Sequence, residues 1–222
     1  MSTLPSVRVD RVCVGTVVPY GDETSAIAKV AQPGAISVAP EGLGGDARAE
    51  DGHNSPDNAI HHYPAEHVAH WRTVFPDNAA LVEDAPFGEN LSTRGCVETD
   101  VCIGDRFRLG SSVIELTQGR DPCWKLNHRM GEPGLVKQIH AQGRIGWYYR
   151  VLEAGTVSAG DALVCIERPH AGWTVARGAA LLFGARPEGA ALEELLTLPA
   201  LGEAWTARAT KRLAKRSSGA SP

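Results

Sequence analysis

Alternating apolar and polar residues predict short strands over much of the chain. Residues 7–18 are rich in β-branched side chains, which favour strands. Their alternation slips by one position between Val9 and Val12, a pattern that a β-bulge would accommodate. Further strands are predicted at residues 35–38, 106–109, 112–117, 146–152 and 162–166. Short strands at this density, separated by glycine and aspartate turns, predict a mainly β protein with a closed or nearly closed barrel.

Helical spacing in this part of the chain predicts only a few peripheral helices. The first begins at Pro64, because proline is favoured in the first turn, and Val68 and Trp71 recur on one face. A second is expected at 133–142. The histidines around the first helix are His61, His62, His67 and His70. A solvated helix face is their favoured interpretation and a metal site the alternative, although HExxH spacing is absent.

The pattern changes at Arg168-Pro169, beyond which there is almost no strand signal. Three helical stretches follow, at about residues 174–183, 188–197 and 199–215. We therefore predict a barrel domain at 1–167, a three-helix extension at 168–216 and a disordered tail at 217–222. An extension of this size has a small core for independent stability, so it is expected to cap the barrel or to support a homodimer.

Composition and charge add few restrictions. The formal net charge of −4 over 222 residues gives no general reason to expect nucleic-acid binding. The last helix sets five basic residues against Glu203: Arg208, Lys211, Arg212, Lys215 and Arg216. A solvated face is favoured there over a docking patch for an acidic partner or nucleic acid. No apolar run approaches the roughly 18 residues of a membrane span, and the N-terminus has no apolar signal core, so the expected location is cytoplasmic.

Cysteine chemistry points to one position. The five cysteines, at 13, 96, 102, 123 and 165, include no CxxC pair, which argues against an iron–sulfur cluster, a structural zinc site and a disulfide scaffold. Cys123 follows Pro122, which resists helix and sheet, and lies between Arg120 and Lys125, whose charge favours a thiolate. It is a candidate nucleophile or metal ligand. The alternative is a buried structural cysteine.

Two polar loops could hold an anion. The first runs from Thr24 to Lys29, and the second consists of Ser92, Thr93 and Arg94. The alternatives are plain surface loop for the first and, for the second, a tight turn in which Asn90 bonds its own backbone. The glycines at 42–45 do not form GxGxxG and precede no clear helix, so a dinucleotide fingerprint is rejected.

Taken in order, these segments resemble the MOSC domain family, named after the C-terminal part of molybdenum cofactor sulfurase, and within it the YiiM type. The matching segments are Thr24–Lys29, Gly42–Asp46, His53, Ala59–Pro64, Phe87–Leu91, Gly104-Asp105, Gln118-x-Arg120-x-Pro122-Cys123-x-Lys125-Leu126 and Gly146-Trp147-Tyr148-x-Arg150. The resemblance implies a MOSC-type β-barrel with a C-terminal three-helix extension.

The resemblance also implies a function. Members bind the pyranopterin form of molybdenum cofactor, and the YiiM type is associated with reducing N-hydroxylated compounds such as hydroxylaminopurine-type base analogues. The cysteine matching Cys123 is the molybdenum ligand or, in sulfurase relatives, a sulfur carrier. The residues expected to hold the cofactor are Lys29, His53, Asn90, Ser92, Thr93, Arg94, Arg120 and Lys125. The family is also described as binding pyridoxal phosphate, but no lysine here has a convincing Schiff-base context.

The chain departs from the family pattern at residues 53–58. Relatives usually read His-Gly-Gly-x-x-Lys/Arg-Ala, whereas this chain has Asn54 and Ser55 for the glycines and Asn58 for the cation. An asparagine donates hydrogen bonds without the charge-assisted contact to phosphate. Cofactor affinity or substrate choice is therefore expected to differ from the relatives.

Two function classes remain. A reductase would need a separate electron-donating partner, because the chain has no flavin or iron–sulfur motif. A carrier would hold a persulfide on Cys123, or deliver the cofactor without turnover, and would need no substrate pocket. The aromatic strand from Trp147 to Tyr149 bears on the choice. Two of its three aromatic residues are expected in the core, and any that line a pocket where purines stack would favour the enzyme.

Overall fold

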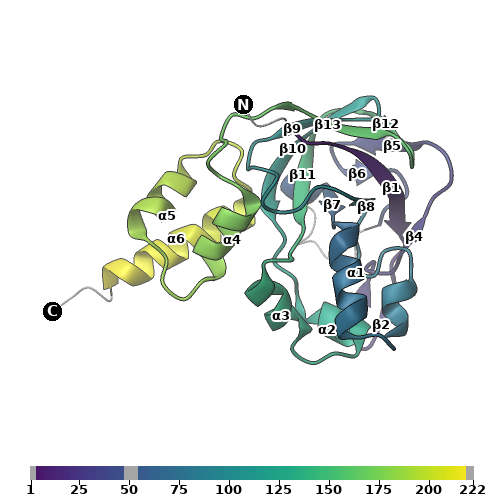
Figure 1. Ribbon diagram of the computed structural model, residues 1–222, viewed down its shortest axis with the longest axis horizontal. Coiled ribbons are helices and arrows are strands. Elements are labelled where there is room, and N and C mark those ends of the chain that lie inside the picture. The colour runs from purple at the N-terminus through teal and green to yellow at the C-terminus, as the bar shows by residue number, and fades with distance from the viewer. Residues whose placement is uncertain (1–3, 48–54, 219–222) are drawn as a thin grey trace.

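In the residues that the structure describes, 4–47 and 55–218, seven strands close into a barrel; the structure is a computed structural model (Figure 1). The barrel strands are β1 (Ser6–Gly15), β7 (Ile60–His62), β8 (Leu91–Thr93), β9 (Arg106–Leu109), β10 (Ser112–Gly119), β11 (Trp147–Glu153) and β13 (Ala162–Glu167). Their order is β13-β9-β10-β11-β7-β8-β1, and β1 pairs with β13 to complete the ring. The predicted mainly β barrel is therefore confirmed.

The first strand bends and pairs with three neighbouring strands. Residues Ser6–Arg8 of β1 pair with β13, Val9–Val12 with β8, and Cys13–Gly15 with the short strand β4 (Lys29–Ala31). The register shifts between Val9 and Arg11, where the slipped alternation predicted a bulge. A bulge bends a strand and increases its twist, which allows one strand to close the barrel and then leave it.

Smaller strands lie beside the barrel. They are β2 (Val18–Tyr20), β3 (Glu23–Ser25), β5 (Ile36–Ala39), β6 (Gly42–Leu43) and β12 (Gly155–Val157). β12, β5 and β6 form a three-stranded sheet, and β2 and β3 form a hairpin. Two 3₁₀ turns, η2 (Pro56–Asn58) and η3 (Ala79–Val82), complete the connections.

The barrel interior is filled by aromatic residues that are also hydrogen-bonded. Trp147 and Tyr149 are both fully buried, and Trp147 Nε1 donates to Tyr149 Oη at 2.7 Å. His62 lies 3.1 Å from the same hydroxyl through Nδ1 and 2.8 Å from Thr93 Oγ1 through Nε2. Burial lowers the pKa of His62 to about 3, so this imidazole is neutral inside the core.

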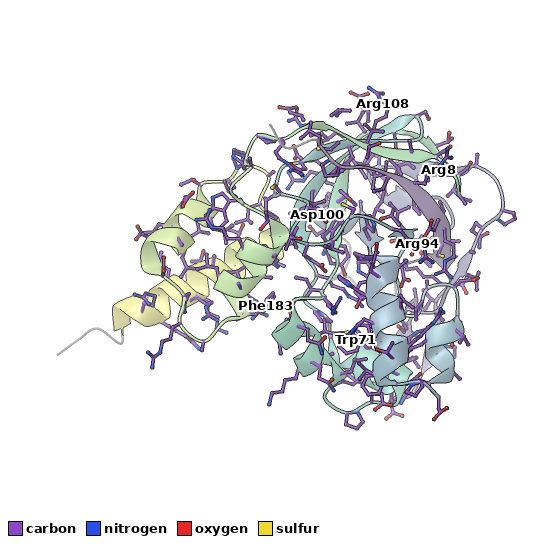
Figure 2. All side chains as sticks on the ribbon, viewed as in Figure 1. Arg8, Trp71, Arg94, Asp100, Arg108 and Phe183 are labelled. Carbon is purple, nitrogen blue, oxygen red and sulfur yellow. The ribbon has the colours of Figure 1, made fainter. Side chains whose placement is uncertain are left out.

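Three helices cover one end of the barrel: α1 (Ala65–Val74), α2 (Trp124–Met130) and α3 (Leu135–Gln142) (Figure 1). Pro64 directly precedes α1, close to its predicted start, and Trp71 on this helix is fully buried (Figure 2). The interpretation of the histidines as a solvated face is wrong for His61, His62 and His67, which are buried. His67 Nε2 is 2.7 Å from Glu98 Oε2, so an internal carboxylate replaces water as its partner.

The C-terminal helices α4 (Val175–Phe183), α5 (Gly189–Leu196) and α6 (Glu203–Ser218) pack beside the barrel (Figure 1). Trp205 of α6 fills the space beside Gly119, where an added Cβ would lie 2.5 Å from the indole. Phe183 packs against His140 of α3 with ring centroids 4.3 Å apart (Figure 2). No helix in the described ranges has the length and apolarity to cross a bilayer.

Two boundaries differ from the sequence-based expectation. The third C-terminal helix begins at Glu203 rather than near 199, and it continues to Ser218 rather than ending near 215. Gly202 explains the late start, because its N–H donates to Thr117 O in the barrel at 3.0 Å. The predicted tail at 217–222 therefore begins inside the helix, and residues 219–222 lie outside the described residues.

The strand predicted with one buried face is buried on both. All eight residues of β10 are buried, including the polar Ser112, Glu115 and Thr117. Ser112 Oγ donates to Leu109 O at 2.7 Å, and Thr117 Oγ1 donates to Asp57 O at 2.7 Å. The polar positions of the alternation are therefore covered by neighbouring chain and bonded to it.

The junction between the barrel and the helices is held by a buried ion pair. Asp105 is fully buried, and its carboxylate receives Arg168 Nε at 2.9 Å and Nη2 at 2.6 Å. A second bond from Arg168 Nη2 reaches Asp100 O at 2.7 Å (Figure 2). Removal of one partner from such a pair leaves an uncompensated charge in the interior.

We expect Arg168→Ala to lower the free energy of unfolding by about 3 kcal/mol, because it leaves the buried Asp105 carboxylate without its charged partner. Urea unfolding followed by circular dichroism measures this. The control is Arg94→Ala, which breaks the exposed pair with Asp10 at 3.1 Å and should cost less than about 1 kcal/mol. Equal losses in the two variants would contradict a structural role for the Arg168 pair.

Candidate functional site

A pocket lies where β10 ends and the chain turns into α2, beside β7 and the start of β11. Its walls come from the 25–29 loop, the 46–47 loop, η2, the 88–90 turn and the 120–125 segment. The lining residues are Ser25, Ala26, Ile27, Lys29, Asp46, Ala47, Asn58, His61, Gly88, Asn90, Arg120, Cys123, Lys125 and Tyr148. Five of the predicted site residues therefore meet in one place: Lys29, Asn90, Arg120, Cys123 and Lys125.

Cys123 is presented at the mouth of α2. It occupies the N-cap position in an extended conformation, after Pro122, and its sulfur caps no backbone N–H. All five cysteines lie among the described residues, and Cys123 is the exposed one. Burial raises the pKa of the others, to about 12 for Cys13 and Cys96 and to about 11 for Cys102 and Cys165. The alternative of a buried structural cysteine at 123 is therefore wrong.

Three cations line the pocket, each oriented by the protein. Lys29 Nζ is paired with Asp46 Oδ2. Arg120 is buried and donates through Nη1 to Phe87 O at 2.5 Å. Lys125 is also buried, donates to Thr24 O at 3.1 Å and lies 2.9 Å from Glu23 Oε2. These contacts hold positive charge in the pocket that Cys123 also lines.

Asn90 joins the walls rather than facing the pocket freely. Its Oδ1 accepts the His61 N–H at 3.0 Å, and its Nδ2 donates to Cys13 O at 3.1 Å and to Asp46 Oδ2 at 2.8 Å. The alternative interpretation, a turn in which the Asn90 side chain bonds its own backbone, is wrong, because this side chain bonds two strands and a loop. This amide positions Asp46, and through it Lys29.

His61 and Tyr148 form an aromatic wall that the sequence analysis did not select. Their ring centroids are 5.1 Å apart. Burial and then Arg120 hold the pKa of His61 well below its usual value, so the ring is neutral, and its Nδ1 donates to Gly88 O at 3.2 Å. Burial raises the pKa of Tyr148, which keeps its hydroxyl proton at neutral pH. As expected, two aromatic residues of this strand are core, and one lines the pocket.

Three predicted residues do not line this pocket: Ser92, Thr93 and Arg94. Ser92 and Thr93 are fully buried in β8, and Thr93 is bonded to His62 inside the barrel. Arg94 is exposed and paired with Asp10 (Figure 2). His53 lies outside the described residues.

Asp46 and Asn58 line the pocket but were missing from the predicted site. Asp46 accepts the Gly15 N–H at 2.8 Å through Oδ1, in addition to Lys29 and Asn90. Asn58, at the end of η2, accepts from Gln118 Nε2 at 2.7 Å. Asp46 lies in a segment that matches the family, and Asn58 lies in the segment that departs from it. Their place in these segments was the sequence signal that could have identified them as site residues. Among the described residues, no group of three His, Cys, Asp or Glu side chains is arranged to hold a metal ion.

Glu89 is a buried carboxyl directly behind the pocket wall. It lies between Gly88 and Asn90 and is fully buried. Its Oε2 accepts the Phe87 N–H at 2.9 Å, while Oε1 has no partner in the part of the chain that the structure describes. Burial raises the pKa of Glu89 to about 7 from its ordinary value of 4.5. The turn that orients Arg120 and His61 is therefore held by a group that titrates near neutrality.

Comparison with known proteins agrees with this architecture. The MOSC domain model matches residues 49–164, and the YiiM-like 3-alpha helix domain model matches residues 173–216. The chain belongs to the MOSC domain family. Protein YiiM of Escherichia coli (strain K12) is 36% identical over 203 residues, which cover 90% of each chain. The predicted family membership is thus confirmed.

Two further relatives extend the comparison. A crystal structure of YiiM from Escherichia coli superposes with a TM-score of 0.79 at 30% identity and covers 96% of this MOSC chain and 94% of that chain. A protein of Gibberella moniliformis (strain M3125 / FGSC 7600) named Reductase is 37% identical over 173 residues. That match covers 78% of this chain but only 30% of the reductase.

Thiol labelling provides a test of the site geometry. We expect iodoacetamide to modify one thiol of the native protein rapidly at pH 8, because the other four are buried and hold their protons far above that pH. Intact mass measures the number of additions. Cys123→Ser should remove the rapid addition, whereas Cys165→Ser should leave it. Rapid modification that survives Cys123→Ser would contradict this geometry.

Glu89 makes a second test, through pH. The folded protein binds this proton more tightly than the unfolded chain, so stability falls as pH rises from about 4.5 through about 7, by up to roughly 3 kcal/mol. Glu89→Gln should abolish that loss, and the free energy of unfolding in urea at pH 5 and pH 8 measures it. The exposed Glu153→Gln is the matched control and should keep the wild-type slope. Identical slopes in wild type and Glu89→Gln would exclude the raised pKa.

Proposed function

We propose that this MOSC protein is an oxidoreductase that binds the pyranopterin molybdenum cofactor through Cys123 and reduces N-hydroxylated compounds. The observation that supports this most directly is the meeting of an exposed thiol with three cations in one pocket. A soft thiolate suits a thiophilic transition metal. The cations Lys29, Arg120 and Lys125 suit the negative charge of a dithiolene and a phosphate.

The residues fit the cofactor by their donor chemistry. Asp46 is the carboxylate in the pocket lining, and it is already shared by Gly15, Lys29 and Asn90. The remaining polar groups are mainly donors or cations. A Cβ added at Gly88 would lie 2.8 Å from the Ile27 side chain, so only glycine lets the backbone approach Ile27 this closely. An anionic ligand would meet a surface prepared for negative charge.

The chemistry is a two-electron reduction. When bound, the cofactor would supply the oxygen transfer by which R–NH–OH, two electrons and two protons become R–NH₂ and water. Tyr148 keeps its phenolic proton at neutral pH and can donate a hydrogen bond to a leaving oxygen. The Tyr148 ring lines the pocket, packs against the neutral His61 ring at an interplanar angle of 41°, and offers an aromatic face on which a purine can stack.

The electrons would come from a separate reductase. The chain carries no flavin or iron–sulfur motif. The relative named Reductase supports an oxidoreductase role, but this chain covers only 30% of its length. We therefore assign the cofactor and substrate pocket to this chain and the electron donor to a partner.

A sulfur carrier is the second candidate, and the exposure of Cys123 favours it equally. A persulfide on Cys123 would need access and nearby positive charge, both of which are present. The aromatic wall of His61 and Tyr148 favours the enzyme, because a carrier has no use for a surface that stacks a planar base.

Molybdenum content tests the proposal. The protein would be purified from a host that makes the cofactor, and elemental mass spectrometry would give metal per chain. We expect near-stoichiometric molybdenum in wild type, loss of most of it in Cys123→Ser, and retention in the buried-thiol control Cys165→Ser. Reduction of an N-hydroxylated purine with an artificial electron donor should follow the same order.

Other outcomes would separate the two candidates. Metal-free wild type from a cofactor-proficient host would contradict the molybdoenzyme. A persulfide on Cys123, detected by mass in the same preparation, would then favour the carrier. Metal that remains in Cys123→Ser would contradict the thiolate as its anchor.

A further inference from the structure

A single buried amide connects the pocket wall to the C-terminal helices. Gln118, near the end of β10, is 2% exposed. Its Nε2 donates to Asn58 Oδ1 at 2.7 Å, and its Oε1 accepts the backbone N–H of Trp205 at 3.1 Å. Asn58 lines the pocket and Trp205 lies in the first turn of α6. The amide therefore spans from the helical region to the ligand site.

The donor and acceptor of each hydrogen bond that Gln118 makes are fixed by chemistry. A backbone N–H can only donate, so the atom of Gln118 that faces Trp205 must be the oxygen. The nitrogen of Gln118 must then face Asn58, and the atom of Asn58 that receives it must be Oδ1. Asn58 lines the pocket, and its remaining polar group, Nδ2, makes no hydrogen bond with another of the described residues.

The contact between Gln118 and the start of α6 leaves little room for movement. A Cβ on Gly202 would lie 2.4 Å from Gln118 Oε1, so the backbone approaches the amide as closely as glycine permits. Asp57, next to Asn58, accepts the Glu203 N–H through Oδ2 at 2.8 Å and pairs with Arg150 at 2.8 Å through Oδ1. The bond from the Glu203 N–H to Asp57 thus ties the start of α6 to the turn that carries Asn58, and Arg150 holds Asp57 in place.

We propose that Asn58 is a ligand-binding residue whose Nδ2 donates to a phosphate oxygen of the bound ligand, and that Gln118 and the backbone of α6 hold it in that orientation. This deepens the function proposed above and rests on it for the identity of the ligand. Asn58 adds a neutral donor to the wall that carries Lys29, Arg120 and Lys125. The helical region then acts as a positioning element for the pocket.

Gln118→Glu tests the orientation without altering the pocket lining. A carboxylate has only acceptors, so one oxygen keeps the Trp205 N–H and the other requires Asn58 to turn Nδ2 away from the pocket. Asn58 then presents its carbonyl oxygen to the ligand. We expect inorganic phosphate, measured by calorimetry at pH 8 on the cofactor-free protein, to bind about tenfold more weakly, as loss of one hydrogen bond to the phosphate predicts.

The added charge of Gln118→Glu is controlled by a double-mutant cycle. In an Asn58→Ala background there is no amide to turn, so Gln118→Glu should weaken phosphate binding by less than about threefold. The Asn58→Ala change alone should weaken it by about tenfold. Thermal unfolding of each variant verifies that it is folded, and Asn58 is only half-buried, so its replacement is tolerated.

The outcomes separate this inference from the proposed function. If Gln118→Glu weakens phosphate binding equally in both backgrounds, the effect is one of charge alone, and the proposal that Gln118 orients Asn58 is overturned. Absence of phosphate binding by wild type would overturn the donor role. Molybdenum content of the same variants tests the function independently, since a metal-free protein can still show the cycle with phosphate.

Protein purified with its cofactor shows whether the phosphate that Asn58 binds belongs to the cofactor or to a substrate. If it belongs to the cofactor, chain purified with its cofactor should no longer bind inorganic phosphate. If it belongs to a nucleotide substrate, the loaded chain should still bind it. Either result supports Asn58 as the donor and identifies which ligand it holds.

Discussion

The candidate site depends on one side-chain amide, that of Asn90. It accepts from the backbone of β7 at His61, donates to the backbone of β1 at Cys13, and donates to the carboxylate of Asp46. Asn90 is 3% exposed, so water cannot replace these bonds. Because β1 leaves the barrel at this point, its backbone groups need a side-chain partner. The same amide that links β7 to β1 also sets the position of Asp46, and hence of Lys29.

Charge in the pocket is organised around this framework. Each cation has an oxygen partner behind it: Asp46 for Lys29, the Phe87 carbonyl for Arg120, and Thr24 and Glu23 for Lys125. These contacts restrain side chains that would otherwise lose much rotamer freedom on binding a ligand. The Cys123 thiol is exposed at this pocket, whereas burial raises the pKa of the four thiols in the core. The site is therefore largely formed before any ligand arrives.

Local pattern predicted much of the fold and part of the site. Strong β alternation and a slipped register identified β1 and its bulge, because both are properties of neighbouring residues. The three-residue strands β7 and β8 were missed, since so few residues carry no period. Cys123, Arg120 and Lys125 share a short segment and could be found there. Ser92 and Thr93 could not be excluded, because their orientation follows from a strand that the pattern did not reveal.

The remaining site residues depend on contacts between distant parts of the chain. Asn58 and Gln118 are 60 positions apart, and Gln118 and Trp205 are 87 apart, so no local rule relates them. A change of pattern near residue 168 predicts where strands give way to helices, but it does not predict which side chains cross that boundary. Gln118 crosses it, and each of its bonds has a direction that backbone chemistry imposes. The composition of the pocket wall is thus encoded at residue 58, while the polarity that this wall presents is encoded in the last helix.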